Sequence, residues 1–253
     1  MLGLGLRFGT RPKTTITDPA PKLHPVRIVA IGQGAIEIAE QIIPSESIMD
    51  RLYLETDIRP LERILNAWTF CLGKRVARGL GSQGLGEVAY AAFEESRDEL
   101  NNIIDTMDAK FGAPKTVILI VCLGGGMGHI APNVAELFKS HGANVVAFAT
   151  MPFKFEGEER AKSAAIALKN LQSRIFAVFA RTNDQLDGGV KNLTDATYYS
   201  NQTISGNVEL CADAFANSKD GERDRDICNA LIRGHINEGA IQGLKVPWGT
   251  IHW

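Results

Sequence analysis

The sequence has no long hydrophobic run, no paired cysteines and no excess of basic residues, and each absence excludes a class of protein. No apolar run approaches the roughly 18 residues that cross a bilayer. The four cysteines show no C-x-x-C spacing and no neighbouring histidine cluster, which argues against a metal site or a disulfide framework and favours reduced thiols. With 27 basic against 29 acidic residues, the composition gives no support to nucleic-acid or anionic-membrane binding.

The N-terminal segment also lacks the uninterrupted apolar stretch of a secretory signal. Arg7, Arg11 and Lys13 break it up. We therefore expect a cytoplasmic protein that does not insert directly into a membrane. Residues 1–25 are rich in proline, threonine and glycine, which predicts a flexible tail ahead of the ordered domain.

Predicted strands alternate with predicted helices along the ordered part of the chain. The strands are Val26–Ile31, Leu52–Glu55, Thr116–Leu123, Asn144–Thr150 and Arg174–Ala180. The helices are Ala35–Ile43, Arg59–Phe70, Glu87–Phe111, Ala131–His141, Glu158–Leu171 and about Thr194–Phe215. This alternation predicts an α/β fold with three layers, in which helices cover both faces of a mostly parallel, Rossmann-like sheet. Ligands of such sheets bind beyond the carboxyl ends of the strands.

Three glycine-rich segments follow predicted strands or precede predicted helices. They are Leu123–His129 (LGGGMGH), Gly32–Gly34 (GQG) and Arg78–Gly84 (RGLGSQG). Glycines expose backbone N–H groups, and a following helix adds its positive end, so such loops suit a diphosphate or triphosphate. A tight turn that needs glycine only for packing is the alternative for any one of them. Neither a Walker P-loop nor a dinucleotide fingerprint fits the spacing, which makes an NAD-dependent enzyme a poor fit.

Several ordered blocks resemble the FtsZ/tubulin superfamily of GTPases, and the FtsZ branch in particular, over about residues 26–215. The blocks are Arg78–Gly81 with Glu94–Arg97, Leu123–Gly128 with Ala131–Glu136, Pro152–Gly157 with Arg160, and Thr182–Leu186. The resemblance implies the three-layer GTPase domain of that superfamily over residues 26–216, with GTP or GDP as ligand, commonly accompanied by Mg²⁺.

The resemblance also implies roles for individual residues. Gly32, Gln33 and Gly34 would approach the phosphates, and Gly124, Gly125, Gly126, Met127 and Gly128 would wrap them. Glu156 would bond the ribose, Arg160 the phosphate or sugar, Asn183 the ribose or base, and Asn201 the guanine. From the residues alone, Glu156 and Arg160 could equally form a surface ion pair, Asn183 a turn and Asn201 an exposed helix position.

Some positions depart from the family pattern. The loop after Leu123 is one residue shorter than in relatives, and Met127 and His129 stand where the family has hydroxyl side chains. His129 could donate in their place, although a surface histidine at a helix N-terminus is the simpler interpretation. Ile36 and Glu37 replace small or amide residues, and the Glu37 carboxylate would repel a triphosphate unless a cation intervenes.

The N-x-D-x-x-D motif of FtsZ does not occur after the central helix, where FtsZ continues into a second domain. We expect residues 217–253 to form a divergent tail instead. Its mixed-charge run at 220–226 is more typical of a solvated turn than of a replacement for the missing acidic pair. Trp248 and Trp253 could cover a surface or contact a partner.

These features lead to a hypothesis about function. The chain is expected to bind guanine nucleotides with weak or absent hydrolysis, to act in cytoskeletal or cell-division processes, and to associate with itself or with an FtsZ-like filament. An active GTPase that uses Glu37 or residues 220–226 is a second possibility. A nucleotide-independent interaction module with the same fold is a third.

Overall fold

The core of the protein is one sheet in which every strand runs parallel to its neighbours. The computed structural model describes residues 23–175, 177–184, 192–218 and 226–228. The strands pair in the order β3-β2-β1-β4-β5-β6. They are β1 (Val26–Ile31), β2 (Ile48–Glu55), β3 (Trp68–Cys71), β4 (Thr116–Cys122), β5 (Asn144–Met151) and β6 (Ala177–Thr182). The predicted parallel sheet is confirmed.

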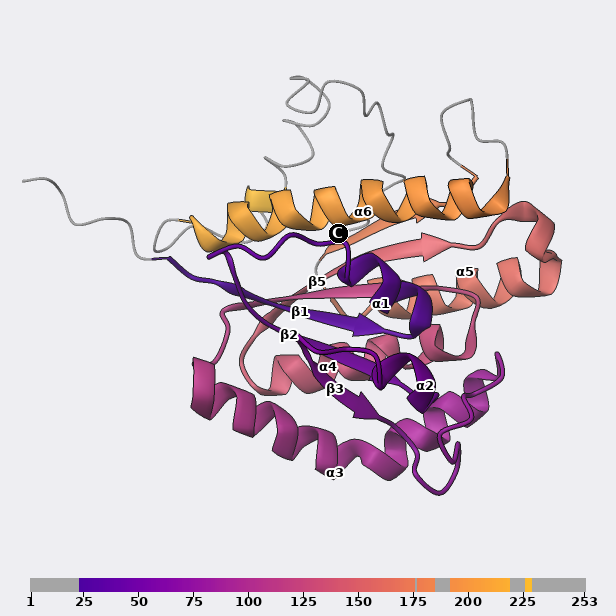
Figure 1. The fold of residues 1–253 in the computed structure, drawn as a ribbon, viewed down its shortest axis with the longest axis horizontal. Coiled ribbons are helices and arrows are strands. Elements are labelled where there is room, and N and C mark those ends of the chain that lie inside the picture. The colour runs from indigo at the N-terminus through magenta and orange to yellow at the C-terminus, as the bar shows by residue number, and fades with distance from the viewer. Residues whose placement is uncertain (1–22, 176, 185–191, 219–225, 229–253) are drawn as a thin grey trace, which may run out of the picture.

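Helices cover both faces of this sheet (Figure 1). They are α1 (Gln33–Ala39), α2 (Ile58–Leu61), α3 (Gly86–Phe111), α4 (Ala131–Ser140), α5 (Glu158–Gln172) and α6 (Leu193–Ala216). Two short 3₁₀ turns, η1 (Gly126–Ile130) and η2 (Lys154–Glu156), precede α4 and α5. One apolar cluster joins the sheet to α3, α4 and α5, and a second joins its other face to α1 and α6. The three-layer prediction is therefore correct.

The predicted helix Arg59–Phe70 is wrong beyond Leu61. Asp57 caps a helix of only one turn, and the chain then enters the edge strand β3, whose Trp68, Thr69 and Phe70 pair with the end of β2. Aromatic and β-branched side chains favour a strand, and pairing with β2 outweighed the helical spacing of the apolar residues. Other bounds also differ: α1 ends at Ala39, β2 begins at Ile48, and β6 spans Ala177–Thr182 rather than the predicted Arg174–Ala180.

The ends of the domain are tied to α6. The backbone N–H of His24 donates to the carbonyl of Ala216 at 2.8 Å, and Ile227 and Cys228 are buried in the cluster that contains α6. The N-terminal tail up to residue 22, the charged run at 220–226 except for its last residue, Asp226, and both terminal tryptophans lie outside the described residues. Among the helices that are described, none has the length and apolar character needed to cross a membrane.

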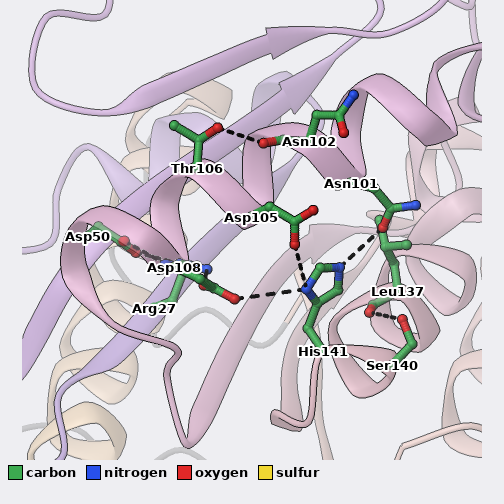
Figure 2. Close-up of polar contacts among 10 residues, drawn as sticks. All are labelled: Arg27, Asp50, Asn101, Asn102, Asp105, Thr106, Asp108, Leu137, Ser140 and His141. Atoms are coloured by element: carbon green, nitrogen blue, oxygen red, sulfur yellow. Dashed lines mark hydrogen bonds and ion pairs between the residues drawn. The ribbon is translucent and has the colours of Figure 1, made fainter.

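A buried arginine fixes the amino end of the sheet. Arg27 in β1 is fully buried, and its guanidinium donates to both carboxylate oxygens of Asp50 in β2 at 2.7 and 2.8 Å. A third bond of 2.7 Å reaches Asp108 near the end of α3. Figure 2 shows Asp108 between Arg27 and His141. One ring nitrogen of His141 faces Asp108, and the other lies 3.2 Å from the side-chain oxygen of Asn101. This network joins β1, β2, α3 and the end of α4.

We expect Asp50→Ala to destabilise the protein by about 3 kcal/mol or more, because it leaves a buried guanidinium without its two-pronged partner. Asp105→Ala is the control, since that carboxylate is 68% exposed and should contribute about 1 kcal/mol or less. Urea unfolding followed by circular dichroism measures both variants. Equal losses in the two would contradict a special role for the buried pair.

Candidate functional site

The three glycine segments meet at the carboxyl ends of the strands, as predicted. Gly32 follows β1 with φ +91°, and a methyl group placed on it would lie 3.1 Å from Cβ of Met127. A methyl group on Gly126 would lie 2.3 Å from the hydroxyl oxygen of Ser82. The loop 124–128 therefore packs directly against the first loop, Gly32–Gly34, on one side. On the other side it packs against the loop 73–85, which contains Arg78–Gly84.

The loop 73–85 is held by the side chains of α3. The carboxylate of Glu95 accepts bonds from the backbone N–H groups of Arg75 and Val76 at 2.9 and 3.0 Å. The bond from Arg75 does most to hold the pKa of Glu95 below its usual range. Ser96 accepts from the N–H of Gly73 at 2.8 Å. These three bonds fix the loop to the helix that follows it.

Arg160 lies against the glycine loop from the side of α5. A methyl group on Gly124, whose φ is +89°, would lie 3.0 Å from the Arg160 side chain, and one on Gly125 would lie 3.8 Å from its terminal nitrogen. The guanidinium pairs with Glu156 at 3.0 Å, and Glu156 also accepts from the N–H of Phe153 at 2.8 Å. The ion pair expected from spacing alone is present, and it stands beside the loop.

An open cleft of about 960 Å³ lies between α1, α2 and the first turns of α6, and Gln33 is the residue of the glycine segments that lines it. Gln33, Glu37, Tyr198 and Asn201 all line it. Asn201 is mostly buried in this position rather than an exposed helix residue. Asn183 lies elsewhere: its side chain accepts a bond of 3.3 Å from the hydroxyl of Ser200 in α6.

The side chains of Met127 and His129 both pack against other parts of the protein. Met127 is buried, and its sulfur lies 3.6 Å from the hydroxyl of Thr56. The ring of His129 is half-buried and contacts both Gly125 and Ser163 of α5. His129 is thus a partly exposed residue before α4, as the simpler interpretation expected, and its ring also packs against α3 and α5.

Sequence reasoning missed a buried carboxylate at the end of β2. Glu55 is 6% exposed, and its side chain accepts from the N–H of Thr56 at 2.6 Å and from the Thr56 hydroxyl at 3.0 Å. Its other oxygen faces Gly32. The signal in the sequence was a run of polar residues, Glu55 to Asp57, directly after a strand at the edge where ligands bind.

Cys122 ends β4 directly beneath the first loop. Burial raises the pKa of its thiol to about 11, so it is protonated at neutral pH. A methyl group on Gly34 would lie 2.9 Å from its sulfur, which explains a glycine inside α1 at this point. Among the described residues, no three His, Cys, Asp or Glu side chains gather to hold a metal ion.

A model of the Tubulin/FtsZ family, GTPase domain, matches residues 26–191. The chain belongs to this family. Cell division protein FtsZ of Helicobacter pylori is 30% identical over 181 residues, which cover 68% of this chain and 43% of the relative. The same protein of Methanothermobacter thermautotrophicus is 32% identical over 161 residues, which cover 63% of this chain and 38% of the relative. The chain thus spans less than half the length of these FtsZ relatives.

Solved structures of FtsZ-like proteins share the fold. CetZ2 from Haloferax volcanii, a GTPγS-bound protofilament, aligns with a TM-score of 0.69 at 18% identity and covers 81% of this chain and 62% of its own. An empty FtsZ dimer from M. jannaschii aligns with a TM-score of 0.67 at 24% identity and covers 82% and 60%. These alignments confirm the GTPase-domain architecture.

We expect Gly34→Ala to destabilise the protein by about 1–3 kcal/mol, because the added methyl overlaps the Cys122 sulfur. Combining it with Cys122→Ala should recover most of that loss, since the space is then free. Gly206→Ala in α6 is the matched control, with no atom within 4 Å of the added methyl. It should be neutral or stabilising. Thermal unfolding of the four proteins measures this, and an unrescued double variant would contradict the steric explanation.

Proposed function

We propose that this chain binds a guanine nucleotide, GTP or GDP, with its phosphates on the glycine loop 124–128 and its base in the cleft beside α6. The observation that carries the proposal is the junction of the two features. A glycine loop with Arg160 against it follows a buried strand and packs against Gly32, and the neighbouring Gln33 lines the cleft that Asn201 also lines. Membership of the Tubulin/FtsZ GTPase-domain family supports the same ligand.

The phosphate end relies on backbone N–H groups and one exposed cation. The side chain of Arg160 is 51% exposed despite its bond to Glu156, so it can turn toward an anion at the loop. Glu37 and Glu55 place carboxylates near the first loop. A divalent cation carried by the nucleotide would reduce their repulsion of the phosphates, which favours Mg²⁺ with the triphosphate.

The cleft in which we place the base has a polar side chain that can hydrogen-bond to it and an aromatic side chain on which it can stack. An asparagine amide both donates and accepts, so Asn201 can pair with a purine edge from the wall of the cleft. Tyr198, one turn earlier, is 53% exposed on the same wall and offers a ring on which a base can stack. We infer that Gln33 and Asn183 contact the nucleotide less directly, at the phosphate and ribose ends.

We infer that hydrolysis is weak or absent, because Met127 and His129 replace the hydroxyls of the family loop and both are engaged in protein contacts. Relatives are cell division proteins, and CetZ2 has been solved as a protofilament. We therefore propose a cytoskeletal or cell-division role in which the chain associates with itself or with an FtsZ-like filament.

A nucleotide-independent interaction module is the second candidate. The same two side chains favour it, because they hold the loop by contacts within the protein. Guanine-selective binding separates the two candidates, since only the first requires it.

Calorimetric titration with GTP, GDP and ATP in the presence of Mg²⁺ tests the proposal. Arg160→Ala should weaken binding of all three by about ten- to a hundredfold, because it removes a charged partner of the phosphates. Asn201→Ala should lower the preference for GTP over ATP by about tenfold, because it acts on the base alone.

Lys162→Ala is the matched control for charge. Lys162 also lies on α5 but pairs with Glu158 and Glu159, and its removal should leave affinity unchanged. Absence of binding to any of the nucleotides at millimolar concentration, in protein that carries none after purification, would overturn the proposed function and favour the interaction module.

A further inference from the structure

The imidazole of His129 connects three parts of the site. Its Nδ1 lies 3.3 Å from the carbonyl oxygen of Gly125, and its Nε2 lies 3.3 Å from the hydroxyl of Ser163 in α5. A carbonyl can only accept, so Nδ1 carries the proton and donates to Gly125. In the neutral ring Nε2 then accepts from Ser163. One side chain thus ties the glycine loop to a helix on the other side of it.

The start of α3 is shaped to receive this ring. A methyl group on Gly86 would lie 2.6–2.8 Å from three atoms of the imidazole. Gly86 is not among the glycines with positive φ, so its backbone is open to other residues and the space taken by His129 accounts for the glycine. Gly86 and His129 are therefore a complementary pair, 43 positions apart in the sequence.

Met127 holds the same loop from the opposite side. Its buried side chain packs under Gly32 and reaches Thr56 at the end of β2. Within η1, the side chain of Met127 is thus directed toward β1 and β2, and that of His129 toward α3 and α5. The loop between them is braced on both sides by residues of this chain.

We propose that His129, seated on Gly86 and joining Gly125 to Ser163, is a positioning residue that holds the glycine loop in its phosphate-binding shape when no nucleotide is present. The inference rests on the proposed function only where it assigns that shape to phosphate binding. The brace itself is a property of the nucleotide-free protein. Met127 and His129, which replace the hydroxyl side chains of the family, would thus order the loop before a nucleotide binds.

Hydrogen exchange read by mass spectrometry on the nucleotide-free protein tests the brace. In His129→Phe, which keeps a ring but removes both nitrogens, amides of residues 124–130 should exchange about tenfold faster. Ser163→Ala, which keeps the imidazole, should produce a smaller increase in the same segment. His141→Phe is the matched control, because that histidine lies at the other end of the sheet and should leave this segment unchanged.

Unchanged exchange at 124–130 in both His129→Phe and Ser163→Ala would overturn the inference, as would an increase spread evenly over the whole domain. If His129→Phe fails to fold, two measurements remain: hydrogen exchange in Ser163→Ala, and the tautomer of the His129 imidazole in the wild-type protein. Nitrogen-detected NMR of the wild-type imidazole should find the proton on Nδ1, and a proton on Nε2 would contradict the bond to Gly125. Because no nucleotide is present in these measurements, their failure leaves the nucleotide titrations as an independent test of the proposed function.

Discussion

The helix α3 is the element on which both ends of the structure depend. Its 26 residues span about 39 Å, enough to run the full depth of the sheet. Near its C-terminus, Asp108 binds the buried guanidinium of Arg27. At its N-terminus, Gly86 receives the ring of His129. Between them, Glu95 holds the loop 73–85. A charged network at the amino end of the sheet and a packed loop at the carboxyl end are thus joined by one rigid helix.

The packing at the carboxyl end differs in kind from that at the amino end. Arg27 is held by charge and is fully enclosed, so its partners cannot change without a large loss of stability. The glycine loop is held by close packing and by two hydrogen bonds of His129. Contacts of that kind fix a shape at modest energetic cost.

The sequence predicted those features that depend on local pattern. A continuous apolar run is sufficient to identify β4, and the glycine spacing identifies the loops, because strand and turn preferences act over neighbouring residues. The predicted helix Arg59–Phe70 extends into Trp68–Phe70, because only pairing with β2 makes that segment a strand. The contact of His129 with Gly86 and Ser163 could not be found in the same way, because it depends on how separate elements pack.

The charges around the glycine loop explain why its shape matters. Arg160 already pairs with Glu156, and Glu55 brings a buried carboxylate up to Gly32. Side-chain charge near the loop is therefore net negative, and an anion there must be recognised largely by backbone N–H groups. Such groups bind phosphate well only when they point to one place, since an N–H that is turned away contributes nothing. The two braces, Met127 and His129, therefore act on the part of the site that has to be most exact in its geometry.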